Sequence, residues 1–212
     1  MTKTLFYLFD PLCGWCYGLT PALSALNETP GIVVRLLPTG LFSGRGARAM
    51  DDDFAGFAWS NDKRIERLTG QAFTQRYRDE VLGDRQRPFD SGPATLALTA
   101  VALTAPASEV GMLKAIQRAR YVEGSDVTSF ATLASLLNGL GLTPAAEALA
   151  QPDADLLQAN ATRISHAQSL MREFDARGVP TLIAEVGDRR RLLNSGAGYS
   201  DPRGLIHQLE VA

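Results

Sequence analysis

The chain has 212 residues, 45% of them hydrophobic, so it is long enough to bury one substantial core. With 21 Lys and Arg against 23 Asp and Glu, its formal net charge of -2 gives no sign of a nucleic-acid or membrane-surface partner. No stretch approaches the length of a membrane span, and the apolar run Leu5–Phe9 is too short for a signal-peptide core. We therefore expect a cytoplasmic protein.

A strand–helix–strand unit is predicted at the start of the chain. The continuous apolar runs Lys3–Phe9 and Ile32–Leu37 are typical of strands buried on both faces. Between them, apolar residues at helical spacing predict a helix from Gly14 to about Asn27, kinked by Pro21. Such a βαβ unit has parallel strands joined by a right-handed crossover.

The middle of the chain, from Phe42 to Ala159, shows helical patterns and almost no strand. A long helix follows from about Asp153 to Ala176. The segments Thr181–Val186 and Arg191–Asn194 then flank Gly187-Asp188, a hairpin turn signal, before a last helix that ends at Glu210.

This order predicts an α/β fold, with βαβ and αββα halves and a large all-helical insertion between them. The two halves are each too small to stand alone. We expect residues 1–41 and 160–212 to form one domain, with residues 42–159 as the insertion.

The only two cysteines, Cys13 and Cys16, follow directly after the first predicted strand. Two thiols separated by two residues in the first turn of a helix can form an internal disulfide, and one can resolve a mixed disulfide made by the other. A helix N-terminus favours a thiolate at the first position. The placement predicts that Cys13 attacks and that Cys16, one turn further in, resolves.

Other roles for the pair are half of a zinc site or two buried thiols. A zinc site lacks ligands, because His166 and His207 lie far from the cysteines and neither has a companion at metal spacing. Buried thiols would not explain the strand-to-helix placement. We expect redox chemistry, with no metal and no bound cofactor.

The motifs around these cysteines resemble those of a known superfamily. Cys13-Gly14-Trp15-Cys16 followed by Pro21 resembles the active-site helix of thioredoxin, and Arg177–Thr181 resembles its cis-proline loop. A helical block between the two halves is the arrangement of the DsbA family of disulfide oxidoreductases. Within that family, signal-less bacterial proteins described as candidate protein-disulfide isomerases are similar at Asp10–Gly18, Leu68–Phe73 and Asp90–Pro93.

The resemblance covers nearly the whole chain and is weakest from about Gly44 to Asp53. It implies a thioredoxin-like fold and a cis Val179–Pro180 peptide bond facing the disulfide. The Val179 backbone would then bind an extended substrate as an added strand. Gly14, Trp15, Pro180 and Thr181 would complete the substrate site.

Two features near the motif bear on its chemistry. The strongly oxidising DsbA enzymes carry a histidine before the second cysteine, whereas Trp15 supplies no positive charge, so we predict a weaker oxidant. Asp10 is the only carboxylate near the motif. It is interpreted first as a turn former before Pro11, with a proton relay to Cys16 as the alternative.

Aromatic side chains near the motif and in the insertion have two interpretations. They are either core or the walls of an apolar groove beside the dithiol. The residues concerned are Trp15, Tyr17, Phe42, Phe54, Phe57 and Trp59. Such side chains are more often core.

The leading functional hypothesis is an enzyme that reduces or isomerises disulfides of proteins or small molecules, exchanging with glutathione or a protein thiol. A cytoplasmic location argues against net oxidation. The alternatives are a glutathione-dependent transferase or isomerase of the kappa or hydroxychromene carboxylate isomerase type, and a non-enzymatic binding module. The kappa-type enzymes usually have serine at the position of Cys13. We expect a monomer, with no nucleic-acid or membrane partner.

Overall fold

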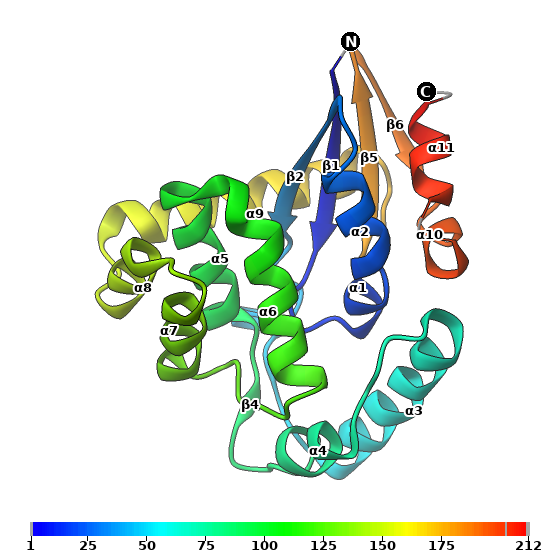
Figure 1. Cartoon of the computed structure of the whole chain (residues 1–212). Helices are drawn as coiled ribbons and strands as arrows, with labels where there is room; N and C mark the ends of the chain where they lie inside the picture. Colours follow the sequence, from blue (N-terminus) through cyan, green and yellow to red (C-terminus); the bar gives the residue numbers. More distant parts are fainter. Residues whose placement is uncertain (1, 202, 211–212) are drawn as a thin grey trace.

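The computed structural model describes residues 2–201 and 203–210. Its main sheet has the strand order β2-β1-β5-β6. β1 and β2 are parallel, whereas β5 is antiparallel to both β1 and β6 (Figure 1). This confirms the predicted parallel unit and the predicted hairpin. The strands are β1 (Lys3–Phe9), β2 (Ile32–Pro38), β5 (Thr181–Val186) and β6 (Arg189–Leu193).

Strand β1 is central, and both of its faces are covered by helices. Leu5, Tyr7 and Phe9 lie in the larger core cluster, together with apolar residues of α2 (Thr20–Asn27) and α11 (Gly204–Glu210). Phe6 and Leu8 pack in a second cluster with residues of α9 (Ala154–Glu173). Figure 1 shows α2 in front of the sheet and α9 behind it. The uninterrupted apolar run of β1 is therefore a consequence of burial on two sides.

The predicted helix from Gly14 to Asn27 is two helices, α1 (Gly14–Gly18) and α2, which meet at Leu19. Pro21 lies in the first turn of α2. Proline has no N–H and its ring clashes with the carbonyl of the preceding turn, so it is tolerated at a helix start but not inside a helix. The expected kink is thus a break.

The helical part between the two halves of the sheet has one strand ladder that the sequence pattern did not predict. The short strands β3 (Arg48–Ala49) and β4 (Pro88–Phe89) pair antiparallel. The helices of this part are α3 (Asp52–Thr69), α4 (Gln75–Tyr77) with a π-helical turn at Arg78–Leu82, α5 (Gly92–Thr104), α6 (Glu109–Tyr121), α7 (Phe130–Gly139) and α8 (Thr143–Ala150).

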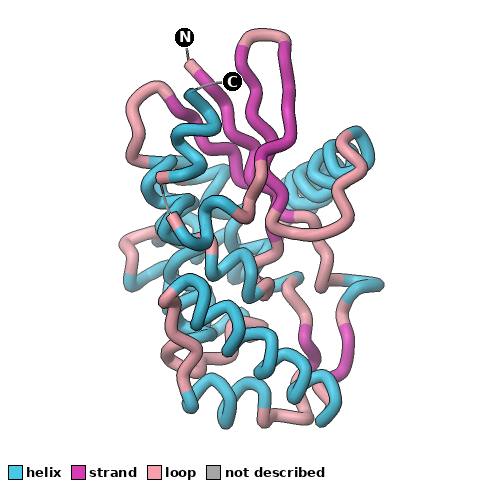
Figure 2. Tube along the Cα trace, turned by 90° about the vertical axis from the view of Figure 1, so that its right-hand side faces the viewer, coloured by secondary structure: helices cyan, strands magenta, loops and turns pink. Residues whose placement is uncertain are grey.

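The two parts of the molecule lie end to end. Figure 2 shows the main sheet at one end and most helices at the other. Helix α9 runs through the expected boundary at 159/160 and joins the two parts. After β6 the chain ends in α10 (Ala197–Ser200) and α11. Among the helices of the described residues, none is both long enough and apolar enough to cross a membrane.

A half-buried arginine on α9 holds the helical part against the sheet. Arg163 Nη2 donates to the Leu36 carbonyl of β2 at 2.9 Å, and Nη1 donates to Thr99 Oγ1 of α5 at 3.0 Å. Its guanidinium also forms an ion pair with Glu109, the first residue of α6. Burial raises the pKa of Glu109, and the positive charge of Arg163 acts against that rise. One side chain thus connects four elements.

We expect Arg163→Met to destabilise the protein by about 3–5 kcal/mol at pH 7, because it leaves Glu109 buried without its cation. The pKa of Glu109 in the folded variant would rise further above its unfolded value. The loss should therefore shrink as the pH falls towards 4, where Glu109 is protonated in both states. Denaturant unfolding at several pH values measures this. Arg172→Met, exposed on the same helix, should change stability little. An equal loss at all pH values would contradict the role of Glu109.

Candidate active site

The two cysteines lie where β1 passes into α1, and they differ in exposure. Cys13 is the N-cap residue of α1 with extended backbone dihedrals, and 7% of it is exposed. Cys16 lies one turn later and is fully buried. Both are free thiols. Of the two sulfur atoms, that of Cys13 is therefore the one on the accessible side.

Burial raises the pKa of the Cys16 thiol well above its usual value. The hydrogen bond and charge of Cys13 raise it further, and so does the charge of Asp10. A sulfur with these neighbours stays protonated at neutral pH. It needs a proton acceptor before it can attack a mixed disulfide.

The Val179–Pro180 peptide bond is cis, as the resemblance implied. Cys13 Sγ donates to the Val179 carbonyl oxygen at 3.6 Å, so the loop before β5 lies beside the exposed thiol. The Val179 N–H donates no hydrogen bond to any residue that the structure describes. Thr181 pairs with Leu8 in the sheet, and its hydroxyl donates to the Gly178 carbonyl at 2.7 Å. The free N–H is thus available to a ligand, whereas the Thr181 hydroxyl proton is already used.

Two glycines let α1 pack closely against α3. A Cβ atom on Gly14 would lie 2.4 Å from Asp62 Oδ1, and one on Gly18 would lie 2.7 Å from Ile65 Cγ2. Both distances are shorter than van der Waals contact, so a side chain at either position would require Asp62 or Ile65 of α3 to move. The glycine between the two cysteines is therefore a packing requirement.

Tyrosine hydroxyls fix the backbone around the cysteines. Tyr7 Oη donates to the Cys16 carbonyl at 3.2 Å, and Tyr121 Oη donates to the Leu12 carbonyl at 2.7 Å. Trp15 meets Tyr199 of α10 edge to face, with ring centroids 5.1 Å apart. The dithiol segment is held by residues from both halves of the chain.

Asp10 is fully buried and forms the turn that the sequence predicted. Its Oδ1 accepts from the Leu12 N–H at 2.9 Å. Its Oδ2 accepts from the Phe42 N–H at 3.0 Å and from Ser91 Oγ at 2.7 Å. Burial raises the pKa of Asp10, and these three hydrogen bonds together with Arg120 lower it, leaving it above the usual value. The carboxylate joins the loop before Cys13 to two points of the insertion.

A hollow of about 120 Å³, partly open to solvent, lies beside Cys13. Its aromatic lining includes Trp15, Phe42, Phe54 and Phe57. The preferred interpretation of these side chains as core is wrong for Phe57, which is 67% exposed. Aromatic residues have the same spacing in the sequence whether their helix face packs on a core or lines a groove, so the sequence could not distinguish the two.

The other two aromatic candidates do not line this hollow. Tyr17 is core, stacked on Tyr121 with ring centroids 4.8 Å apart. Trp59 faces a neighbouring hollow, where Arg78 lies over its ring. Val179, Pro180 and Thr181 also lie outside the hollow, so Cys13 stands between it and the cis-proline loop.

Asp62, which lines the hollow, belongs to a buried charge cluster with Tyr77 and Arg120 that the sequence did not reveal. Asp62 of α3 is 4% exposed, and its Oδ2 accepts from Tyr77 Oη at 2.9 Å. Burial raises the pKa of Asp62 to about 7, although the Tyr77 hydrogen bond and the charge of Arg120 lower it. Burial alone would lower the pKa of Arg120, but Tyr77, Tyr121 and Asp62 raise it above its usual value. Arg120 thus stays charged.

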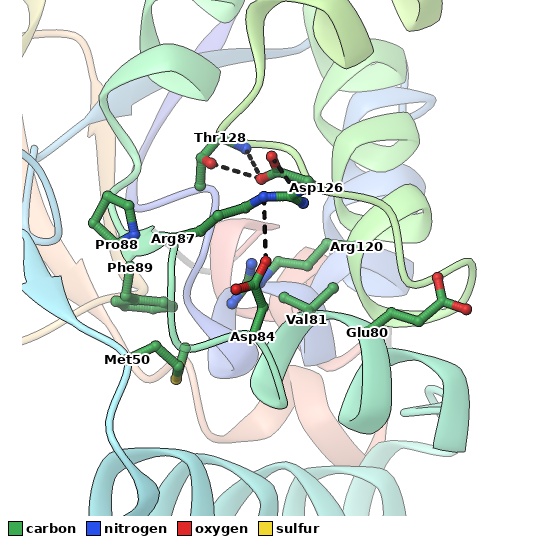
Figure 3. A pocket seen from close by; sticks show the side chains of 10 residues that line it. All are labelled: Met50, Glu80, Val81, Asp84, Arg87, Pro88, Phe89, Arg120, Asp126 and Thr128. Atoms are coloured by element: carbon green, nitrogen blue, oxygen red, sulfur yellow. Dashed lines mark hydrogen bonds and ion pairs between the residues drawn. The ribbon is translucent and has the colours of Figure 1, made fainter.

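Arg120 lines a second cavity, drawn in Figure 3, and lies against aromatic rings that line the active-site hollow. Its guanidinium lies 5.2–5.6 Å from the ring centroids of Tyr77, Phe89 and Tyr121. Its Nε and Nη2 have no hydrogen-bond partner within the described part of the chain. In the cavity, Arg87 bridges Asp84 and Asp126. The rings and the buried carboxyl groups stabilise Arg120 in place of water.

The sequence does hold a weak signal for this cluster. Ala55, Asp62, Ile65 and Thr69 share one face of α3 by helical spacing, so Asp62 interrupts a stripe that faces α1. It stands, however, in the run Asn61–Arg64, whose composition is that of a solvated helix face. No pattern in the sequence pairs it with Tyr77 or Arg120.

Solved structures show the same architecture. The cytosolic disulfide reductase DsbM from Pseudomonas aeruginosa is 36% identical, with a TM-score of 0.88 over 99% of this chain and 100% of that one. A structure of the same reductase with GSH gives 35% identity and a TM-score of 0.86, covering 98% of each chain. A candidate protein disulfide isomerase from Nitrosomonas europaea is 23% identical, with a TM-score of 0.81 over 100% and 97% of the two chains.

No protein-family model and no curated protein matches the chain. The similarity to DsbM covers 99% of this chain and all of that one, and in this chain the cysteine pair lies at the end of β1. The chain belongs to the DsbA family of thioredoxin-fold thiol–disulfide oxidoreductases.

Proposed function

We propose that this oxidoreductase works as a disulfide reductase in the cytoplasm, with Cys13 as the attacking thiol. The observation that carries the proposal is the difference between the two sulfur positions. Cys13 borders both the aromatic hollow and the Val179 carbonyl, whereas Cys16 is fully buried behind it. A substrate disulfide reaches the first sulfur only.

The reaction proceeds by two exchanges. Cys13 Sγ attacks one sulfur of the substrate disulfide, forms a mixed disulfide and releases the first thiol. Cys16 Sγ then attacks Cys13 Sγ, which releases the second thiol and leaves a Cys13–Cys16 disulfide. An external dithiol or two thiols reduce that bond and restore the enzyme.

The substrate lies between the hollow and the cis-proline loop. The free Val179 N–H and its carbonyl bind an extended segment as an added strand, an interaction that does not depend on side chains. Gly14 and Trp15 border the segment on the side of the hollow, and Pro180 and Thr181 shape the loop. This arrangement suits varied protein or small-molecule disulfides.

The charges at the edge of the hollow favour glutathione as the thiol that exchanges with the enzyme. Two guanidinium groups lie on its aromatic rim, Arg48 at 4.1 Å from the ring centroid of Phe54 and Arg64 at 5.7 Å from that of Trp15. Both arginines are exposed, and they can pair with the carboxylates of a small peptide thiol. DsbM, which is similar over its whole length, has been solved with GSH.

The proposed enzyme is a monomer.

Asp10 is the candidate acceptor for the Cys16 proton. Its charge acts on the pKa of Cys16, and its own pKa is raised by burial, so the two groups can exchange a proton. This role is additional to the turn that it forms.

We expect Cys13→Ser to abolish the reduction of insulin by glutathione. Cys16→Ser should accumulate a mixed disulfide between Cys13 and glutathione, because nothing displaces the bound thiol. Intact-mass spectrometry of both variants after incubation with oxidised glutathione checks this. Full activity of Cys13→Ser, or the adduct on Cys16 instead, would contradict the assigned roles.

The dithiol should have a redox potential of roughly -250 to -150 mV, below that of DsbA. Trp15 adds no charge to stabilise the reduced form. The helix behind Cys13 has only five residues, so its dipole is small. Equilibration with glutathione buffers, read by mass spectrometry, gives the value. A potential close to that of DsbA would overturn the argument.

Asp10→Asn should slow the release of the first mixed disulfide on the order of 100-fold, if the carboxylate accepts the Cys16 proton. Ser91→Ala keeps the carboxylate and removes one of its hydrogen bonds, so it serves as the matched control. Single-turnover release from a chromogenic mixed disulfide measures the step. Faster release in Asp10→Asn would mean that Asp10 acts on Cys16 only through its charge.

A further inference from the structure

We propose that Asp62 is the acid–base group of the first exchange, taking the proton of the Cys13 thiol as it attacks and passing it to the departing substrate sulfur. The proposal deepens the function proposed above and rests on it, because it assumes that Cys13 is the attacking thiol. Nothing in the sequence motif assigns such a group, since Asp62 lies in the helical insertion.

The geometry places the carboxyl group beside the segment that carries the reacting sulfur. Asp62 and Cys13 line the same hollow. Asp62 Oδ1 lies against Gly14, the residue that follows Cys13, where it would be 2.4 Å from an added Cβ atom. Oδ2 is fixed by the hydrogen bond from Tyr77, whereas Oδ1 accepts no hydrogen bond from any described residue. The unoccupied oxygen is thus the one beside the dithiol.

The groups that face Asp62 come from three elements. Tyr77 lies on α4, Arg120 and Tyr121 lie on α6, and Cys13 caps α1. Burial raises the pKa of Asp62 to about 7, and the Tyr77 hydrogen bond and the charge of Arg120 prevent a larger rise. A carboxyl group that titrates near neutral pH can both accept and donate a proton at that pH.

The other titratable groups in or near the hollow are unsuited to this role. Burial raises the pKa values of Tyr77 and Tyr121 well above 10, so neither accepts a proton at neutral pH. Arg120 has no acceptor atom. Asp10 does not line the hollow, and its charge acts on Cys16. Each cysteine therefore has its own buried carboxyl group.

The step balances in atoms and charge. The Cys13 S–H bond breaks and its proton moves to Asp62, directly or through one water molecule. Cys13 Sγ forms a bond to one substrate sulfur while the substrate S–S bond breaks. The departing sulfur takes the proton from Asp62 and leaves as a neutral thiol, and the carboxylate ends as it began. No external reductant enters until the Cys13–Cys16 disulfide has formed.

The test is the pH dependence of kcat/KM for reduction of a small disulfide, from about pH 5 to 9, because this quantity reports groups of the free enzyme. In the wild type we expect activity to rise with a midpoint near 7, as Asp62 loses its proton. In Asp62→Asn the rise near pH 7 should be absent, and kcat/KM at neutral pH should fall on the order of 100-fold. Asp53→Asn, an exposed change on the same helix, should keep both the step and the rate.

Tyr77→Phe gives a second, independent readout. The Tyr77 hydrogen bond lowers the pKa of Asp62, so its removal should move the midpoint to higher pH. A merely structural role for Asp62 would not move a midpoint. Should Asp62→Asn fail to fold in a denaturation test, the shift in Tyr77→Phe decides the proposal.

Two results would overturn the proposal. One is an unchanged step near pH 7 in folded Asp62→Asn, and the other is an unchanged midpoint in Tyr77→Phe. Failure of the proposed function looks different, because Cys13→Ser would then match the wild type in the same assay. The two failures are thus separable in one set of measurements.

Discussion

The position of the reactive thiol depends on one buried carboxylate. Asp10 accepts hydrogen bonds from Leu12, Phe42 and Ser91, which belong to the dithiol loop, the loop after β2 and the start of α5. These hydrogen bonds fix the position of the helical part relative to the sheet within a few residues of Cys13. An ionised group with three donors is strongly directional, so the junction has one geometry.

Buried charge continues from this junction to the floor of the hollow. Arg120 acts on both Asp10 and Asp62, and three aromatic rings surround its guanidinium. Removing three ionisable groups from water costs folding free energy, and the mutual attraction of opposite charges offsets part of it. The functional consequence is that two carboxyl groups with raised pKa values, Asp10 and Asp62, lie near the dithiol.

Much of the fold followed from patterns along the chain. The apolar runs Lys3–Phe9 and Ile32–Leu37 gave β1 and β2, and Gly187-Asp188 marked the β5–β6 hairpin. These signals are local, since burial on two faces or a tight turn dictates residue type directly. The cysteine pair and the cis Val179–Pro180 bond came from local motifs together with a resemblance.

What the sequence missed depends on contacts between distant segments. Asp62 meets Tyr77 and Gly14 only because α3 packs against α1, and the exposure of Phe57 depends on which segments cover its face of α3. The break at Leu19 shows a different cause: the helical spacing of apolar residues continued through a point where Pro21 ended the hydrogen-bond ladder. The spacing of apolar residues indicates which face of a helix is buried, but not where the helix breaks or which residues it contacts.

The close approach of α3 to Gly14 also limits how this enzyme can diverge. In thioredoxin-fold proteins the two residues between the cysteines are the natural place to alter redox behaviour. Here a side chain at the first of them would lie 2.4 Å from Asp62 Oδ1, so the Asp62 carboxyl group would have to move. The second, Trp15, is half-buried at the rim and can be exchanged. Of the two residues between the cysteines, only Trp15 can therefore be replaced without a shift of Asp62 on α3.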